Sequence, residues 1–333
     1  MNTLDIKGLR LRLPNTARPV LDGVDLTVGA GETVALVGES GSGKTLTSRT
    51  VLRLLPRGAV AEGTVAVAGD DVLAMDARQL RTLRTRTAAM VFQDPRAAIN
   101  PLRRIGDFLT ESMRLNRIMT ASAAEARAVE LLDAVGLPAG TLHRYPGQLS
   151  GGMLQRVMIA AALMGDPALL LADEPTTALD VTTQAEVVAL LTDLRQRFGT
   201  GLLFVTHDLG LAAAISDRVY VMYAGRVAET GPAEELFARP RHPYTAALLG
   251  STPSPSSEGP PPRRLAAIDG QPPDLREELT GCAFAARCAF ATDLCGREAP
   301  SATPAPGVPA HRAACHHSDA LAGSRLEGKS VDA

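Results

Sequence analysis

The sequence of 333 residues is poor in aromatic side chains and in lysine. Phe, Tyr and Trp make up 3% of the chain, Trp is absent, and no aromatic residue precedes Phe92. The first quarter of the chain therefore lacks a ring on which a base could stack. Lysine occurs only at positions 7, 44 and 329, so Lys44 is the single lysine in the middle of a chain whose other basic residues are arginines.

The chain also lacks a strong charge of one sign and a long apolar run. The 34 basic and 36 acidic residues give a formal net charge of −2, which disfavours nucleic acid as a partner. The longest useful apolar stretch, residues 157–164, is far shorter than the ~18 residues of a spanning helix. The first ten residues show no signal-peptide pattern. We therefore expect a soluble protein.

Residues 1–235 alternate short apolar runs with helical periods, which predicts an α/β domain with a largely parallel sheet. Residues 64–72 read as a hairpin. A helical pattern at about 94–150 interrupts the alternation and predicts a helical subdomain beside the sheet. The clearest strands are expected at 33–38, 168–173 and 202–207, and the clearest helices at 44–55, 151–165, 181–198 and 208–216.

Residues 38–45, GESGSGKT, match the phosphate-binding pattern G-x-x-x-x-G-K-[ST] between an apolar strand and an apolar helix. Backbone N–H groups in such a loop, and the N-terminus of the helix after it, bind phosphate oxygens. We expect Lys44 to reach the β and γ phosphates of a nucleotide and the Thr45 hydroxyl to ligate Mg²⁺. The candidate residues of this loop are Gly38, Glu39, Ser40, Gly41, Ser42, Gly43, Lys44 and Thr45.

Two further motifs bear on the same chemistry. LLLADEP, residues 169–175, ends an apolar strand with Asp173, a candidate Mg²⁺ ligand, and Glu174, a candidate base for an attacking water. LSGGMLQRV, residues 149–157, opens a helix with Ser150 and two glycines, which predicts a second helix N-terminus able to bind an anion.

Together with TALD at 177–180 and VTHD at 205–208, these motifs stand in the order typical of ABC transporter ATP-binding subunits. The chain resembles that family over about residues 3–250. The resemblance implies a P-loop NTPase fold of the RecA-like type, with ATP and Mg²⁺ as ligands and ATP hydrolysis as the activity. In that family two cassettes dimerise head to tail, so that the LSGG helix of one covers ATP bound to the other.

The same resemblance implies roles for individual residues. Ser150, Gly151 and Gly152 would contact the γ-phosphate held by the partner cassette, and Asp180 would lie at the dimer seam. Gln93, in VFQDP, would contact Mg²⁺ and the attacking water, and His207, in VTHD, would contact the γ-phosphate.

Residues 242–253, HPYTAALLGSTP, resemble the branch of the family that imports oligopeptides, dipeptides or nickel. That branch implies a second ATPase subunit, related or identical, two membrane permease subunits and, indirectly, an extracytoplasmic solute-binding protein. The chain would then lie at the cytoplasmic face of the membrane and energise the import of peptides or related small solutes, which the sequence does not distinguish. Two alternatives are a soluble ABC ATPase acting on ribosomes or nucleic acid and a redox-regulated nucleotide-binding subunit.

The chain departs from the family where adenine is held. The family stacks adenine on an aromatic residue before the phosphate loop, and no aromatic residue occurs there. We expect Leu11 or Leu13 to take this place, assisted by Arg12 or Arg18, with weaker base selectivity as the result.

Residues 236–333 form the second predicted domain, a small loop-rich extension. Residues 251–264 are rich in Pro and Ser and predict a linker. The four cysteines of the chain, Cys282, Cys288, Cys295 and Cys315, all fall in this extension and suggest one shared site.

Four thiolates suit a 4Fe-4S cluster, as in some members of the branch, or less readily Zn²⁺, because C-x2-C spacing is absent. The third possibility is that the cysteines carry no ligand. His311, His316 and His317 lie nearby as spare ligands. We expect any cluster to hold the extension together and to have no catalytic role.

Overall fold

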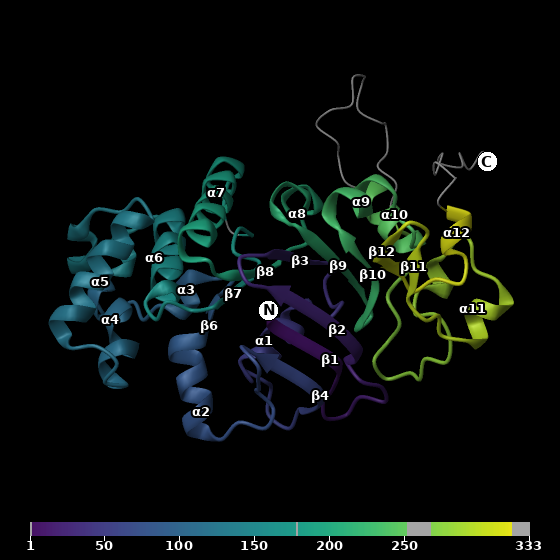
Figure 1. Ribbon diagram of the computed structural model, residues 1–333, viewed down its shortest axis with the longest axis horizontal. Helices are drawn as coiled ribbons and strands as arrows, with labels where there is room; N and C mark the ends of the chain where they lie inside the picture. Colours follow the sequence, from purple (N-terminus) through teal and green to yellow (C-terminus); the bar gives the residue numbers. More distant parts are fainter. Residues whose placement is uncertain (1, 178, 252–267, 322–333) are drawn as a thin grey trace.

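Two sheets and a group of helices make up the fold of the described residues (Figure 1). The computed structural model describes residues 2–177, 179–251 and 268–321. The larger sheet has eight strands in the order β11-β12-β10-β9-β3-β8-β7-β6, and the smaller sheet has four in the order β2-β1-β4-β5. The predicted linker at 251–264 lies almost entirely outside the described residues, as does Ala178 of the TALD motif.

The strands have the following bounds: β1 (Asn2–Arg12), β2 (Leu21–Gly29), β3 (Thr33–Val37), β4 (Val60–Val67), β5 (Asp70–Asp71), β6 (Ala88–Val91), β7 (Leu169–Asp173), β8 (Gly201–Val205), β9 (Arg218–Tyr223), β10 (Arg226–Pro232), β11 (Thr303–Ala305) and β12 (Val308–Ala313). The α-helices have the following bounds: α1 (Lys44–Val51), α2 (Ala77–Thr82), α3 (Pro95–Ala98), α4 (Ile105–Leu115), α5 (Ala121–Ala134), α6 (Gly151–Leu163), α7 (Val181–Phe198), α8 (Leu209–Ile215), α9 (Ala233–Ala238), α10 (Pro243–Gly250), α11 (Asp293–Arg297) and α12 (Ser318–Leu321).

The centre of the larger sheet is parallel, as the alternation of strands and helices predicted. Every residue of β3, β7 and β8 is buried, which explains why these strands read as continuous apolar runs. Their bounds confirm the three predicted strands to within two residues. Helix α1 ends at Val51, earlier than predicted, and Arg53 just beyond it adopts a left-handed backbone with φ 50°.

The smaller, antiparallel sheet was predicted only in part. The hairpin of β4 and β5 confirms the prediction at 64–72, but β1, which pairs with both β2 and β4, was missed. In β1 the buried Leu4, Ile6, Leu9 and Leu11 are separated by charged residues. Such two-residue alternation marks a half-buried strand and contains no apolar run.

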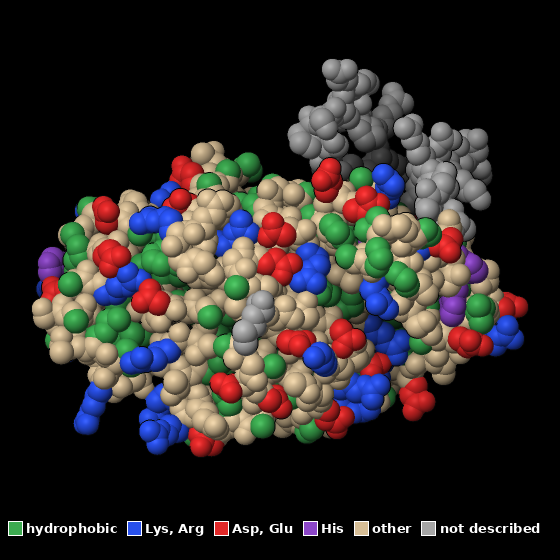
Figure 2. Space-filling view, viewed as in Figure 1, with side chains coloured by type: hydrophobic (Ala, Val, Ile, Leu, Met, Phe, Trp, Pro, Cys, Tyr) green, Lys and Arg blue, Asp and Glu red, His purple; other side chains and the backbone are tan. Residues whose placement is uncertain are grey.

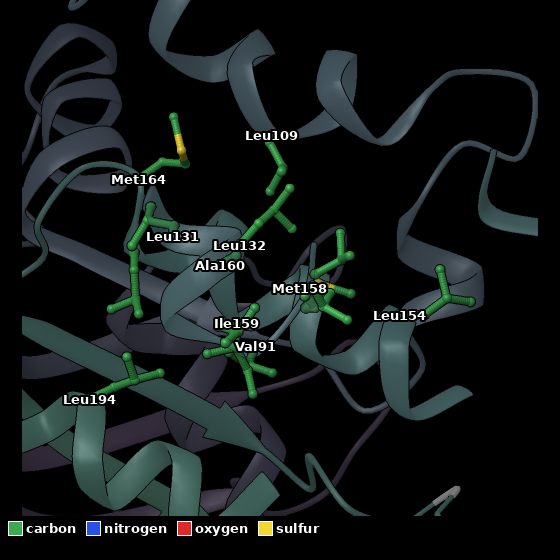
Figure 3. Packing of buried hydrophobic residues seen from close by; sticks show 14 of the residues in the cluster. Val91, Leu109, Leu131, Leu132, Leu154, Met158, Ile159, Ala160, Met164 and Leu194 are labelled. Atoms are coloured by element: carbon green, nitrogen blue, oxygen red, sulfur yellow. The ribbon is translucent and has the colours of Figure 1, made fainter. Parts of the chain in front are cut away.

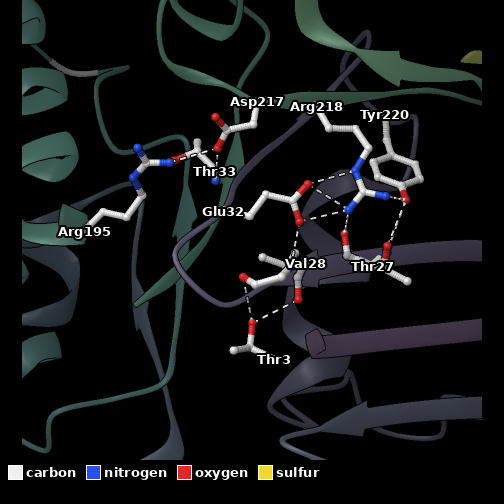
Figure 4. A network of polar contacts seen from close by, with 10 residues as sticks. Thr3, Thr27, Val28, Glu32, Thr33, Arg195, Asp217, Arg218 and Tyr220 are labelled. Carbon is white, nitrogen blue, oxygen red and sulfur yellow. Dashed lines mark hydrogen bonds and ion pairs between the residues drawn. The ribbon is translucent and has the colours of Figure 1, made fainter. Parts of the chain in front are cut away.

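A polar network joins the two sheets (Figure 4). Arg218, at the start of β9, donates to both carboxylate oxygens of Glu32, at 3.0 and 2.9 Å, and to the Thr27 carbonyl at 3.1 Å. Beside it, the Asp217 carboxylate accepts hydrogen bonds from the Thr33 N–H at 2.8 Å and from Arg195 at 2.9 Å. The turn between β2 and β3 is thereby held against β9, which fixes where β3 delivers the loop that follows it.

The helices predicted for the interval 94–150 pack against α6 and the edge of the larger sheet. Leu109 of α4, Leu131 of α5 and Ile159 of α6 are at most 2% exposed and belong to one apolar core with Val91 of β6 (Figure 3). Helix α6 therefore connects the helical region to the sheet through shared side chains.

The C-terminal extension continues the larger sheet. Strand β12 pairs with β10, with Glu229 opposite Ala313, and β11 pairs with β12. The extension also shares an apolar core with the larger sheet: Phe284 packs with Tyr223 and Tyr244, at ring-centroid distances of 5.2 and 5.4 Å. The extension and the helical region lie at opposite ends of the long axis in Figure 1.

A buried carboxylate ties the extension to the sheet. Glu229 of β10 is fully buried and accepts hydrogen bonds from the backbone N–H groups of Arg241 and His242, at 2.7 and 3.0 Å. Its third partner is Nε2 of His311 on β12, at 2.7 Å. One side chain thus joins β10 to two parts of the extension, the segment before α10 and β12.

The face of the protein seen in Figure 2 is mixed in charge. On the face shown in Figure 2, Lys and Arg side chains are interspersed with Asp and Glu over the described residues. None of the helices within the described ranges combines the length and apolar character that crossing a membrane requires.

Replacement of Glu229 by alanine should destabilise the protein strongly. The change leaves the N–H groups of Arg241 and His242 and the His311 ring buried without their acceptor. We expect a loss of about 3–5 kcal/mol in the free energy of unfolding, measured by urea denaturation. Glu234→Ala, an exposed carboxylate on α9, is the matched control and should cost less than about 1 kcal/mol. Equal losses in the two variants would contradict this role of Glu229.

Candidate functional site

The phosphate-binding loop lies between β3 and α1, at the carboxyl end of the parallel strands. Gly38, Gly41 and Gly43 have φ angles of 146°, 79° and 106°, a region that L side chains rarely adopt. A side chain at Gly38 would collide with the Met222 carbonyl, and one at Gly43 would lie 2.6 Å from Leu21. The glycines therefore let the loop curl closely against β2 and β9.

Lys44 begins α1 and points back into the loop. Its ammonium group donates hydrogen bonds to the carbonyls of Gly38 and Glu39, at 2.8 and 2.9 Å, and the side chain is buried. Burial lowers the pKa of Lys44, while the nearby Glu174 and Asp173 carboxylates raise it. The lone mid-chain lysine is thus a buried cation held inside the loop.

Thr45 and Asp173 meet at the edge of the larger sheet where β3 and β7, the two neighbours of β8, both end. The Thr45 hydroxyl donates to the Asp173 carboxylate at 3.0 Å, although 128 residues separate them. Burial at the end of β7 raises the pKa of Asp173, and the hydrogen bond from Thr45 opposes that shift. The two predicted Mg²⁺ ligands are therefore adjacent, and both present oxygen atoms, the ligand type that Mg²⁺ takes.

Glu174 is the centre of a second group. Its carboxylate accepts hydrogen bonds from the Gln93 amide at 3.1 Å and the Thr177 hydroxyl at 3.0 Å, and Nδ1 of His207 lies 3.4 Å away. Its backbone has a φ of 47° and is held by an N–H bond to the Val205 carbonyl at 2.9 Å. The structure thus brings together three predicted residues from the ends of β6, β7 and β8, together with Thr177, whose role the sequence interpretation missed.

The remaining predicted residues form a separate group. Ser150 caps α6 by accepting the Met153 N–H at 3.3 Å, and Asp180 caps α7 by accepting from the backbone and hydroxyl of Thr183, at 3.0 and 2.8 Å. A side chain at Gly152 would lie 2.7 Å from Thr183, so the two helix starts are packed together. Among the described residues, no hydrogen bond joins this group to the phosphate loop.

The structure limits what could hold adenine before the loop. Leu11 is fully buried in the core, and Arg18 donates to the carbonyls of Pro273, Asp274 and Ala224, at 2.7, 3.1 and 3.3 Å. The predictions that Leu11 and Arg18 contact adenine were therefore wrong, because Leu11 is packed in the core and Arg18 is hydrogen-bonded to these three carbonyls. Leu13 and Arg12 remain as candidates, being half-buried and exposed.

Two residues far along the chain reach the phosphate loop, and the sequence interpretation assigned neither a role there. The Tyr244 hydroxyl accepts the Glu39 N–H at 2.8 Å, and Arg287 donates to both Glu39 carboxylate oxygens, at 2.8 and 3.0 Å. The HPY motif at 242–244 is the only signal that could have pointed to Tyr244. Nothing in the local sequence distinguishes Arg287 from the other arginines.

The four cysteines come together without forming a recognisable metal site. Cys282, Cys288, Cys295 and Cys315 line one cavity of about 10 Å³, beside His316 and His317. None is in a disulfide. Burial raises the pKa of Cys282 and Cys288, and that of Cys315 to about 11. Within the described ranges, no three His, Cys, Asp or Glu side chains are arranged to hold a metal ion. The predicted cluster is therefore not confirmed.

The chain is similar to known proteins over most of its length. Residues 21–177 match the family described as ABC transporter, and residues 228–295 match the C-terminal region of oligopeptide and dipeptide transporters. A Brucella melitensis protein, named for peptide import and ATP binding, is 47% identical over 89% of this chain and 92% of its own. The oligopeptide transport ATP-binding protein OppD of Bacillus subtilis is 42% identical over 87% of this chain and 82% of its own.

Solved structures show the same fold. A dimeric bacterial ABC transporter cassette superposes with a TM-score of 0.61 and 28% identity, and the match covers 69% of this chain and 98% of that one. The observed arrangement of sheets and phosphate loop is therefore that of an ABC cassette, as the motif order predicted.

Gly38→Ala should damage the protein through a steric clash. The added carbon would meet the Met222 backbone, which has no flexible end to give way. We expect a loss of at least about 2 kcal/mol in unfolding free energy, measured by chemical denaturation. Gly31 also has a positive φ, 65°, in the left-handed helical region, but open space surrounds it, so Gly31→Ala should cost only about 1 kcal/mol. Similar losses in both variants would show that backbone strain alone explains the effect.

Proposed function

The chain belongs to the ATP-binding subunits of ABC peptide transporters, and from this membership we propose how its own residues act in ATP-driven peptide import. It is an ATP-hydrolysing subunit that energises this import, and ATP with Mg²⁺ is what such an ATPase uses. The similar proteins support neither of the two alternatives, which were a soluble ATPase acting on ribosomes or nucleic acid and a redox-regulated nucleotide-binding subunit.

We propose that the phosphates of ATP lie on the loop at 38–45. Lys44 would exchange its bonds to the loop carbonyls for bonds to the β and γ phosphates, because an anion is a stronger partner for a buried ammonium group than a carbonyl. The N-terminus of α1 adds its partial positive charge at the same place. The buried position of Lys44 supports this role, since a desolvated cation interacts strongly with a bound anion.

Thr45, Asp173 and Gln93 would hold the Mg²⁺ that accompanies the nucleotide. When bound, the cation neutralises charge on the phosphates. The 3.0 Å contact of Thr45 with Asp173 supports this assignment, because it places two oxygen ligands beside the loop.

Glu174 would accept a proton from the attacking water. Its carboxylate is oriented by Gln93 and Thr177 and lies beside His207, which places a base between the strand end and the surface. His207, whose side chain is 58% exposed, can reach outward to the γ-phosphate. The convergence of Gln93, Glu174 and His207 is the observation that best supports hydrolysis at this site.

A second ABC ATPase subunit, related or identical, would complete the site. Among the described residues, no hydrogen bond joins the group of Ser150, Gly151, Gly152 and Asp180 to the chain's own phosphate loop, which leaves this group to contact a nucleotide held by that subunit. The strongly exposed Val181 beside Asp180, at 80%, supports a covered surface here.

We further propose that two membrane permease subunits bind the helical region at about 94–150. A solute-binding protein outside the membrane would deliver the cargo. The chain would then work peripherally at the cytoplasmic face, and its partners would decide which peptide or related solute is carried.

Glu174→Gln should abolish ATP hydrolysis while preserving ATP binding, because the amide keeps the shape of the side chain but cannot take the proton. We expect a fall of about 10²–10⁴ in turnover with retained nucleotide, measured by phosphate release and by ATP binding at equilibrium. Glu186→Gln, at a surface ion pair with Arg156, is the matched control and should leave turnover within about twofold. Normal hydrolysis by Glu174→Gln would overturn the assignment.

We also propose that Cys282, Cys288, Cys295 and Cys315 hold a 4Fe-4S cluster. Their shared cavity supports this assignment, because all four cysteines of the chain line it. Their raised pKa values mean that binding would have to displace protons. The cluster would stabilise the extension and take no part in hydrolysis.

Anaerobic purification followed by a visible absorption spectrum and by iron and sulfide analysis tests the cluster. We expect iron and sulfide in the wild type and their loss in Cys288→Ser, which should unfold more readily but keep the turnover of the folded fraction. Zinc alone, or four free thiols, would overturn the proposal. A loss of turnover in a stable Cys288→Ser protein would argue against a purely structural role.

A further inference from the structure

The phosphate loop contains a carboxylate, which is an unfavourable neighbour for a nucleotide. Glu39 is the second residue of the loop, and the Lys44 ammonium group bonds its backbone carbonyl. A bound triphosphate would bring several negative charges to the same loop. An unpaired carboxylate there would repel them, so the way in which Glu39 is neutralised bears on the affinity of the site.

Arg287 of the C-terminal extension neutralises Glu39. Two parallel hydrogen bonds, 2.8 and 3.0 Å long, join the guanidinium to the two carboxylate oxygens, the geometry in which arginine pairs best with a carboxylate. The Arg287 side chain is 5% exposed and that of Glu39 is 26% exposed. Water therefore reaches the ion pair mainly at Glu39. This contact spans 248 residues of sequence.

Further hydrogen bonds and two aromatic rings hold the guanidinium in place. It donates to the carbonyls of Ile268 and Asp269, at 3.1 and 3.0 Å, and to the Tyr223 hydroxyl at 3.2 Å. The rings of Tyr223 and Phe284 lie 5.7 and 5.9 Å from it. Glu39 raises the pKa of Arg287 more than any other group does. Arg287 therefore presents a fixed positive charge whose carboxylate partner is Glu39.

The backbone of Glu39 is fixed from the same side. Its N–H group donates to the hydroxyl of Tyr244, a fully buried side chain that packs on Tyr223 at a centroid distance of 4.6 Å. Both the charge and the backbone position of this loop residue are thus set by residues at 223–287, outside the motifs that bind ATP.

We propose that Arg287 is a positioning residue for ATP: it pairs with Glu39, so that the phosphate loop offers the nucleotide no unpaired negative charge. The inference rests on the proposed function, because it concerns ATP at the loop of residues 38–45. The C-terminal extension then becomes a condition for tight nucleotide binding, although it contributes no group to the phosphates themselves. Because Arg287 immediately precedes Cys288, whatever orders the cysteine segment also orders this charge.

Three variants of the full-length protein test the electrostatic role: Arg287→Gln, Glu39→Gln and the double variant. Binding is measured at equilibrium with Mg²⁺ and a non-hydrolysable ATP analogue, and KM and kcat are measured with ATP. Arg287→Gln should weaken binding on the order of tenfold and raise KM with little change in kcat. Glu39→Gln should bind within about threefold of the wild type, and the double variant should regain most of the lost affinity.

Two control variants separate positioning from general stability. Arg241→Gln removes contacts to Thr303, Ser318 and Asp319 at the far end of the extension. It should lower thermal stability without changing the Kd of the analogue. Arg276→Gln breaks an exposed ion pair with Asp274 in the extension and should change neither quantity. A third variant, Arg287→Lys, keeps the charge and should bind the analogue with most of the affinity that Arg287→Gln loses.

The proposal is overturned if Arg287→Gln binds the analogue as the wild type does, or if the double variant binds as weakly as Arg287→Gln. It is also overturned if Arg241→Gln weakens binding as much as Arg287→Gln. If the wild type binds the analogue but hydrolyses no ATP, the proposed hydrolysis fails while the binding comparison still decides the role of Arg287. If the wild type does not bind the analogue, both proposals fall.

Discussion

The parallel pairing of β3, β8 and β7 is the constraint on which the site depends. Parallel strands end at the same edge, so the loop after β3, Asp173 and Glu174 at the end of β7, and His207 beyond β8 are brought within a few ångströms of one another. The strands are buried on both faces, which makes a shift of register costly. The distances among these groups are therefore set by the core and not by the loops that carry them.

A second constraint comes from the C-terminal extension, which is bound to the cassette at several points. Glu229 ties it to the larger sheet, Arg18 donates to the carbonyls of Pro273 and Asp274, and Arg287 pairs with Glu39. Buried polar groups of this kind are stabilising only when all their partners are present. The extension and the ATP site are consequently parts of one hydrogen-bonded system, with the cysteine cavity at its outer end.

Most of the candidate site could be predicted from sequence because each of its motifs is local. A glycine-rich loop between a strand and a helix, or two acids after a buried strand, carries its own chemical meaning, and the order of the motifs then indicates the family. Strand β1 was missed because its charged outward residues interrupt the apolar ones. Leu11 and Arg18 were assigned wrongly because a sequence does not show which side chains the core and the extension have already engaged.

The sequence by itself determined the nucleotide chemistry, the helical insertion and the crowding of four cysteines in one segment. Those features depend on residue type and short-range spacing, which the sequence shows directly. Only the tertiary structure decided that Thr45 touches Asp173, that Gln93 and His207 converge on Glu174, and that Arg287 reaches the phosphate loop. These contacts join residues that are between 33 and 248 positions apart in the sequence. Sheet pairing and core packing bring them together, and no local sequence pattern encodes them.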